Sequence, residues 1–410
     1  MKQTTLSLIL LSALFTGTVM AADSPQFRGP NRDGKFPETG LMKSWPADGP
    51  PVAWVAKGFG QGHGSVSVVG DSIYVPGRLD DGQGYLFTVG LDGSIKDKAS
   101  YGTETNEAKS PGARSTPTID GDRAYIMSGL GVVSCLNVKS GKVLWQVDTF
   151  QKFGAPQIRW HIAESILIDG DLAICTPGGK DASLVALNKM TGATVWQTKG
   201  LSDKSAYCSP DIIEHGGKRI VITMTAAYVV GVDVTNGEVL WTHEHETKYD
   251  IHGTTPVYAD GMVYYSAGYG SGGGMIELSA DGTKVTQKWK DMNIDCQHHG
   301  IVLLDGYLYA TSQKGKKLWC LDLKTGDVMW SADEITQAVV EYADGMLYTY
   351  EGPQAGVVSL VKATPQGYER TGSFKFTAGN SEHWAHPTIA NGRMYIRRGD
   401  TVVAYDIAAK

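Results

Sequence analysis

The chain has 410 residues, of which 42% are hydrophobic and 20% charged, and its formal net charge is −6 at pH 7. This balance is typical of a globular protein, and the 51 glycines and 19 tyrosines favour tight turns between aromatic-rich strands. The negative net charge argues against DNA or RNA as the natural ligand, because a polyanion calls for a basic surface.

The chain begins with the features of a secretory signal peptide. Lys2 precedes an apolar run from Leu6 to Phe15, and small residues follow around Ala21. A positive start, an apolar centre and a small-residue cleavage site have this order in signal peptides, and the run is too short to span a bilayer. We therefore expect residues 1–21 to be cleaved and the protein to be periplasmic or secreted, with no membrane span. No cysteine follows the cleavage site, so a lipoprotein anchor is not expected.

Residues 22–51 form a segment rich in glycine, proline and charge, with the phrases QFRGPNRDG and WPADGPP. Such a composition favours turns and irregular structure. We predict an N-terminal arm that lies over the surface of the following domain.

A repeated phrase organises the rest of the chain. CLDLKTGDVMW, residues Cys320–Trp330, recurs as Cys135–Trp145, Ala186–Trp196 and Gly231–Trp241, with a looser copy at Leu278–Trp289. The glycine supplies the positive φ of a turn between two short strands. The tryptophan ends each unit with a large ring that packs best against a neighbouring unit.

A second signal recurs in step with the first. After a turn that contains glycine, each unit has a strand with an aromatic or β-branched residue. These markers are Tyr74, Tyr125, Ile174, Val221, Tyr264, Tyr309, Tyr348 and Tyr395. Eight copies at a period of roughly 40–50 residues are typical of four-stranded propeller blades, and no segment shows helical periodicity. The prediction is an all-β, eight-bladed β-propeller.

The two ends of the repeat region complement each other. Val52–Trp54 is a tryptophan strand without the three strands that should precede it, and the chain stops after the strand Thr401–Tyr405 without a tryptophan strand. Pairing the N-terminal strand with the C-terminal blade would complete the eighth blade and remove two exposed sheet edges. We therefore predict a closed ring and one domain over residues 52–410, present as a monomer.

The repeated phrase resembles the tryptophan-docking motif A-x-D-x-x-T-G-x-x-x-W of the pyrroloquinoline-quinone (PQQ) dehydrogenase propellers. The third position is occupied by Asn137, Asn188, Asp233 and Asp322 in the four close copies. The opening QFRGPNRDG also looks like the start of secreted members of this superfamily. The resemblance implies an eight-bladed PQQ-like propeller. It does not imply a quinone, because the same blades occur in proteins that bind none, such as the propeller lipoprotein of the outer-membrane assembly machine.

Polar residues precede the innermost strand of each predicted blade. Because inner strands converge on the central channel, these residues should meet at one channel mouth although they lie far apart in sequence. They are His63, Arg114, Tyr207, His252, His298, Gln337, His383 and Trp384, flanked by Arg159, Trp160, His161, Asp250, Cys296 and Glu382. We predict a His- and Arg-lined pocket for a small molecule or sugar. The alternative is a water-filled channel whose polar residues cap strand ends.

Quinone chemistry is one candidate for this pocket. Family members that oxidise alcohols use Ca²⁺ held by oxygen ligands, a general-base Asp, an Arg near the quinone and, in many, a disulfide between adjacent cysteines. By that resemblance Asp250 and Arg114 are candidates for catalysis, and the cofactor-binding candidates are Trp384, Tyr207, Arg159 and Trp160. The cofactor would be PQQ with Ca²⁺, and the substrate a small alcohol or sugar. No adjacent cysteine pair exists, and the metal-binding carboxylates have no match by motif.

A transition-metal site is a second candidate. Strand alternation would place Cys296 and His298 on one face, and sulfur with imidazole suits Cu or Zn. The other metal-ligand candidates are His252, His383, His63 and His161. A buried cysteine beside hydrogen-bonded histidines would give the same pattern.

Two further readings stay open. Glu382 or Asp250 with a histidine could act as acid and base on a sugar. Alternatively, the protein is a non-catalytic scaffold of the cell envelope that binds peptide, glycan or another protein, for which an exposed apolar groove would be the sign.

Overall fold

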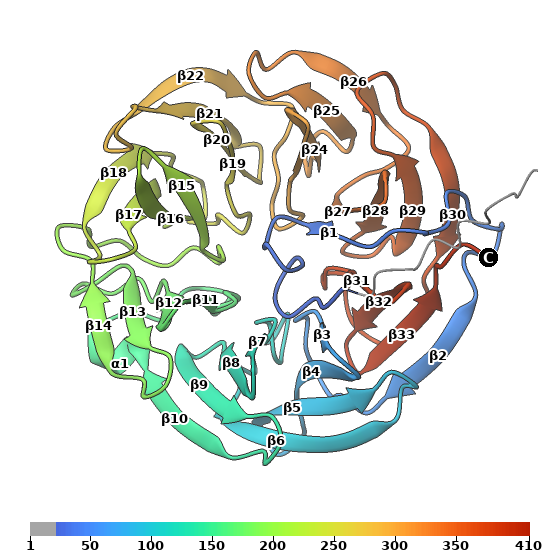
Figure 1. The fold of residues 1–410 in the computed structure, drawn as a ribbon, viewed down its shortest axis with the longest axis horizontal. Coiled ribbons are helices and arrows are strands. Elements are labelled where there is room, and N and C mark those ends of the chain that lie inside the picture. Colours follow the sequence, from blue (N-terminus) through green and yellow to red (C-terminus); the bar gives the residue numbers. More distant parts are fainter. Residues whose placement is uncertain (1–21) are drawn as a thin grey trace, which may run out of the picture.

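The structure, a computed structural model, describes residues 22–410, so the predicted signal peptide at residues 1–21 lies outside the described residues. Eight sheets surround a central channel (Figure 1). From residue 67 to residue 406, the chain runs in each sheet from an inner strand outwards, and each strand is antiparallel to the one before it. The prediction of an all-β, eight-bladed propeller with four-stranded blades is confirmed.

The strands of the eight blades follow one another in chain order. Blades one to four are β3 (Ser67–Val69), β4 (Ser72–Arg78), β5 (Gln83–Gly90), β6 (Ile95–Thr103); β7 (Thr118–Asp120), β8 (Arg123–Met127), β9 (Val132–Asn137), β10 (Val143–Asp148); β11 (Leu167–Asp169), β12 (Leu172–Cys175), β13 (Val185–Asn188), β14 (Thr194–Gln197); and β15 (Asp211–His215), β16 (Lys218–Met224), β17 (Tyr228–Asp233), β18 (Val239–Glu244). Blades five to eight are β19 (Val257–Ala259), β20 (Met262–Ala267), β21 (Gly272–Leu278), β22 (Val285–Asp291); β23 (Val302–Leu304), β24 (Tyr307–Thr311), β25 (Leu318–Asp322), β26 (Val328–Ala332); β27 (Ala338–Ala343), β28 (Met346–Glu351), β29 (Val357–Lys362), β30 (Arg370–Lys375); and β31 (Thr388–Ala390), β32 (Arg393–Arg398), β33 (Thr401–Asp406) with β2 (Val52–Lys57).

The second strand of each blade carries one of the eight marker residues, and every marker is buried. Neighbouring blades cover both faces of these strands, which explains continuous apolar runs such as Ile220–Ile222. The core is therefore a series of clusters between successive blades. All five cysteines are buried and unbridged, and Cys135 and Cys320 fill equivalent places in two blades.

Five of the six tryptophans on outermost strands join their blade to the next through an indole hydrogen bond, whereas the indole N–H of Trp241 has no partner within residues 22–410. Trp196 on β14 donates its indole N–H to the backbone oxygen of Val234, 2.9 Å away, and its ring lies against Gly237 in the turn of the following blade. The same donation occurs from Trp54 to Leu91, Trp145 to Lys189, Trp289 to Leu323 and Trp330 to Thr364. The motif is thus an inter-blade contact, as its sequence predicts.

The turn glycine allows a direct test of that contact. Gly237 has φ +77°, and an added Cβ would lie 2.6 Å from the Trp196 ring, whereas a Cβ at Gly217 (φ +73°) would meet open space. We expect Gly217→Ala to lower the free energy of unfolding by about 1–2 kcal/mol through the left-handed backbone alone. Gly237→Ala should cost about 1–3 kcal/mol more because of steric overlap. Urea denaturation of both variants measures the difference, and equal losses would refute the proposed contact.

The ring closes as predicted. β2 pairs antiparallel with β33, with Trp54 opposite Ala404, and completes the eighth blade. The single helix of residues 22–410, α1 (Thr149–Phe153), lacks the length and apolar character that crossing a membrane requires.

The arm occupies a different place from the predicted one. Its first residues cross the central channel, and β1 (Lys35–Phe36) pairs in parallel with β27 as a fifth, innermost strand of the seventh blade (Figure 1). Arg28 and Arg32 are only 5% and 3% exposed. The predicted surface position was wrong because the inner strands present backbone oxygens to the channel, and both guanidinium groups donate to them.

Candidate functional site

A cavity of about 490 Å³ lies at one mouth of the channel. It is formed where the chain returns from the outermost strand of one blade to the innermost strand of the next. All eight of these connections contribute to the lining, through His63, Arg114, Trp160, Tyr207, Gly253, His298, Gln337 and Trp384. The propeller therefore gathers the residues that precede the inner strands into one site.

The arm forms the floor of the cavity. Phe27 belongs to the lining, and its ring packs edge-on against His386 with centroids 4.9 Å apart. Beneath it, the Glu341 carboxylate accepts from Arg28 at 3.2 Å and lies 2.7 Å from Nδ1 of His386. The arm thus separates the cavity from the other end of the channel.

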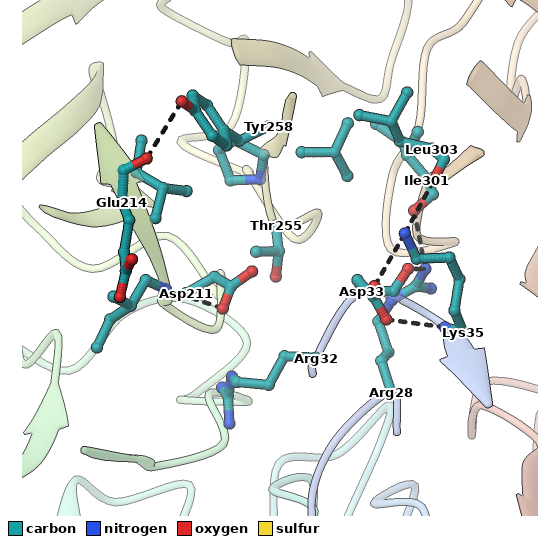
Figure 2. A pocket seen from close by; sticks show the side chains of 14 residues that line it. Arg28, Arg32, Asp33, Lys35, Asp211, Glu214, Thr255, Tyr258, Ile301 and Leu303 are labelled. Atoms are coloured by element: carbon teal, nitrogen blue, oxygen red, sulfur yellow. Dashed lines mark hydrogen bonds and ion pairs between the residues drawn. The ribbon is translucent and has the colours of Figure 1, made fainter. Parts of the chain in front are cut away.

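A second cavity, of about 340 Å³, is lined by Arg28, Arg32, Asp33 and Lys35 of the arm together with residues of inner strands (Figure 2). Its cations already have partners within the described residues. Lys35 pairs with Asp33 at 3.0 Å and donates to the backbone oxygen of Leu303, while Arg28 donates to that of Ile301 at 2.9 Å. These contacts hold the arm to the inner strands, so we interpret this cavity as the seam between arm and ring.

One wall of the first cavity is a stack of three rings. Trp384 lies between His63 and His298, with centroid separations of 5.6 and 5.5 Å. Burial lowers the pKa of both histidines to about 3, and the charge of Arg114 adds to the effect at His63. The imidazoles are therefore neutral at physiological pH. Within the described residues, the buried Nε1 of Trp384 and Nε2 of His298 have no hydrogen-bond partner, which points to a ligand or water there.

The opposite wall is also aromatic. Trp160 packs against Tyr207, with centroids 6.4 Å apart, and Tyr269 completes the lining on this side. Tyr207 and Tyr269 have φ values of 76° and 62°, which cost bulky residues about 1–3 kcal/mol each. His161, Asp250 and Gln337, which lie on other connections at this mouth, also have positive φ. Strain of this kind concentrates at binding and catalytic sites.

The charge of the cavity is positive. Arg114 donates to the backbone oxygen of Ser110 at 2.6 Å and to the backbone oxygen of Trp160. It also forms an ion pair at 3.4 Å with Glu107, which lies outside the lining. The ammonium of Lys109 has no partner among residues 22–410 and is exposed at the rim. No Asp or Glu of the described chain lines the cavity, so the site favours an anion.

The structure brings together seven of the predicted site residues. Those in the lining are His63, Arg114, Trp160, Tyr207, His298, Gln337 and Trp384. The predicted residues outside the lining are Asp250, Glu382, Arg159, His161, His252, His383 and Cys296. The roles assigned to the first group stay predictions.

The predicted residues that do not line the cavity have other partners or lie elsewhere in the fold. Asp250 is exposed and pairs with Lys204 at 3.2 Å, and Glu382 is half-buried beside the lining. The predicted shared face of Cys296 and His298 is wrong, because residues 292–301 form an irregular connection rather than a strand. Cys296 instead packs in the apolar core between blades five and six.

The predicted histidines outside the cavity are bonded elsewhere. Nδ1 of His383 forms a hydrogen bond with the hydroxyl of Tyr350, and Nδ1 of His161 forms one with the hydroxyl of Thr105. His252 is fully buried with its Nε2 3.1 Å from Nδ1 of His245, and Arg159 lies over the outer face of Trp160 instead of facing the cavity.

The donor set does not fit a calcium–quinone centre. Ca²⁺ prefers several oxygen ligands with carboxylates among them, and the described lining has none while carrying two cations. A transition-metal site is not assembled either: no three His, Cys, Asp or Glu side chains of residues 22–410 gather in a metal-binding arrangement. The described lining holds three histidines, His63, His298 and His386, but no Cys, Asp or Glu to complete a ligand set.

Sequence reasoning missed several lining residues. Tyr269, Gln313 and Pro353 come from the turns between the second and third strands of blades five to seven, which also reach this mouth. Aligning that second turn across the repeats would have identified them. Lys109 lies in the same connection as Arg114, whereas Phe27 belongs to the arm, outside any repeat.

The buried histidines predict a pH dependence of stability. Burial lowers the pKa of His252 to about 3, below the ordinary value of about 6.5. Between these values the unfolded chain binds a proton and the folded chain does not, so stability is lost as pH falls below 6.5. By pH 5 this histidine accounts for about 2 kcal/mol. The His252→Gln variant should lose about that much less than wild type between pH 7 and pH 5 in urea titrations. Equal losses would contradict the prediction.

A family model described as outer membrane protein assembly factor BamB matches residues 92–332, more than half of the chain. The chain belongs to this PQQ-like propeller family. BamB of Salmonella typhimurium is 25% identical over 354 residues, covering 70% of this chain and 82% of that protein. The quinoprotein alcohol dehydrogenase PedH of Pseudomonas putida is 30% identical over 152 residues, covering 35% of this chain and only 24% of the enzyme.

Solved structures show the same fold. BamB of Moraxella catarrhalis superposes with a TM-score of 0.63 at 16% identity, covering 87% of this PQQ-like propeller and 100% of that chain. The quinohemoprotein alcohol dehydrogenase of Comamonas testosteroni superposes with a TM-score of 0.66 at 11% identity, covering 95% and 81%. The fold is thus shared with an outer membrane protein assembly factor and with a quinohemoprotein alcohol dehydrogenase.

Proposed function

We propose that this protein binds a small anionic molecule with a flat or cyclic body in the cavity at the channel mouth. The observation that carries the proposal is the combination of two aromatic walls with Arg114 and Lys109 in a lining without carboxylates. Aromatic faces offer apolar contact to a ring, and the cations attract its acidic group.

The proposal is binding rather than oxidation. The carboxylates that could act as a base, Asp250 and Glu382, do not line the cavity, and burial lowers the pKa of two of its three histidines, His63 and His298, to about 3. A good general base needs a pKa nearer the working pH. The third histidine, His386, contacts Glu341 through Nδ1 at 2.7 Å and the backbone oxygen of His298 through Nε2 at 3.0 Å, so both of its ring nitrogens are already engaged within the protein.

Thermal unfolding with matched pairs of compounds tests the proposal. Galacturonate is compared with galactose, and benzoate with benzamide, so that each pair differs mainly in charge. The acids should raise the unfolding temperature in a concentration-dependent way, and their neutral counterparts should not. Equal shifts within each pair, or none with either acid, would contradict an anion site.

Quinoprotein-type oxidation of a small alcohol or sugar is the second candidate, favoured by the sequence similarity to PedH. Its test is dye reduction by the purified protein with added PQQ and Ca²⁺. Reduction that depends on both additions would support an oxidoreductase and overturn a purely binding role.

The scaffold alternative has less support at this site. Most exposed apolar side chains lie on outermost strands, at Val52, Val55, Ile95, Val143, Leu144, Val195, Val328 and Met329, whereas Tyr269 at the cavity and Met190 and Met292 in turns and connections are scattered singly. We also propose export to the cell envelope, which the charged start and apolar run of residues 1–21 support. Fractionation of the native host tests it: a cytoplasmic protein that retains these residues would contradict export.

A further inference from the structure

The aromatic wall of the cavity continues onto the surface. We define the aromatic ridge as Tyr207, Trp160, Tyr249 and Tyr269. Trp160 lies 6.4 Å from Tyr207 and 6.2 Å from Tyr249, and Tyr249 lies 5.1 Å from Tyr269, all between ring centroids. Tyr207, Trp160 and Tyr269 line the cavity, while Tyr249 stands beyond it. The ridge is therefore longer than the cavity that it borders.

Cations accompany the ridge outside the cavity. The guanidinium of Arg159 lies 4.7 Å above the Trp160 ring, and the ammonium of Lys248 lies 5.2 Å from the Tyr249 ring. Both cations are exposed. One carboxylate also stands near the ridge, that of Asp250, which is exposed and paired with Lys204 at 3.2 Å, so the charge that flanks the rings is positive on balance. Such a row of rings suits a ligand whose apolar faces and acidic groups repeat along its length.

Fixed amide groups stand beside the same ridge. Gln297 donates to the hydroxyl of Tyr269 at 2.7 Å, and Gln337 donates to the side-chain oxygen of Gln297 at 3.1 Å. The backbone N–H of Tyr269 donates to Gln313 at 2.7 Å. This network holds the Tyr269 ring in place and presents amides that can both donate and accept hydrogen bonds, which matches hydroxyl-bearing rings.

We propose that the ligand is an acidic oligosaccharide, with one terminal sugar acid in the cavity and its further units over Tyr249 and Tyr269. This inference rests on the proposed function and extends it to a substrate class. Sugar rings combine apolar faces with hydroxyl edges, and sugar acids repeat the negative charge that the row of cations would meet. Single-stranded nucleic acid would also stack on rings, but the net charge of −6 opposes a dense polyanion.

Calorimetric titration with oligogalacturonates of one to four units tests the inference. Affinity should rise at least tenfold from monomer to tetramer. Tyr249→Ala should weaken tetramer binding at least tenfold and monomer binding less than twofold. Tyr85→Ala is the matched control, because Tyr85 also has a lysine, Lys98, 4.7 Å from its ring but lies on the outer part of blade one. This control should leave both affinities unchanged.

Each outcome separates this inference from the proposed function. Equal affinities for monomer and tetramer, with the monomer still sensitive to Arg114→Gln, would overturn the oligosaccharide and leave the anion site standing. Tighter binding of a thymidine hexanucleotide than of the tetramer would overturn it in favour of nucleic acid. No binding at any length would overturn the sugar-acid class, and benzoate would then test the anion site separately.

Discussion

Replacing Arg32 by alanine is expected to lower the free energy of unfolding by about 3–5 kcal/mol. Its guanidinium is nearly fully buried in the channel and donates to the backbone oxygens of Ser165, Ile166 and Pro210 at 2.8, 3.2 and 2.9 Å. Hydrogen bonds to charged groups contribute about 1.5–3 kcal/mol each, and buried oxygens left without donors carry a desolvation cost. Alanine removes the donors and leaves a cavity in the channel.

Urea denaturation of Arg32→Ala measures this effect beside Arg219→Ala. Arg219 pairs with Asp169 on the surface and is about half exposed, so its loss should cost at most about 1 kcal/mol. Similar small losses in both variants would show that the arm is not an integral part of the channel. They would also contradict the assignment of Phe27 to the floor of the cavity.

Trp384→Ala should weaken binding of an acidic ring compound by at least 30-fold. Tryptophans in the centre of binding sites contribute about 2–4 kcal/mol to the free energy of binding. The indole of Trp384 packs against both His63 and His298, so alanine removes the central ring of this wall. Calorimetric titration with galacturonate measures the loss. Trp319→Ala is the control, because Trp319 is half-buried on β25 and does not line the cavity. A Trp384→Ala variant that binds like wild type would exclude the stacked wall from recognition.

The ring of blades was predictable because its signals repeat. The contact between Trp196 and Gly237 recurs between other blades. Because the sequence pattern behind it is present in several copies, it predicted both the propeller fold and the packing of each tryptophan against the next blade. The arm occurs once and has no such support. In the sequence alone, its two arginines are typical of a charged, solvent-exposed segment. Their partners are backbone oxygens that only the folded channel presents, and no sequence pattern marks these oxygens.

The candidate site was predictable in position but only partly in detail. Propeller topology sends the residues before inner strands to one mouth, and this placed Arg114, His298 and Trp384 correctly. Which neighbour faces the cavity depends on irregular backbone: Trp384 lines it while His383 turns to Tyr350. Sequence alternation cannot decide such cases, because it holds only within strands.

The most direct test of an anion-binding cavity compares galacturonate with galactose in two arginine variants. Arg114→Gln removes the more buried of the two cations of the lining, whereas Arg123→Gln removes an arginine of blade two whose partners are Cys135 and Asp122 and which does not line the cavity. Wild type and Arg123→Gln should bind the acid at least tenfold more tightly than the neutral sugar, a difference of about 1.4 kcal/mol. Arg114→Gln should lose most of that preference. Retention of the full preference in Arg114→Gln would contradict this assignment of the site.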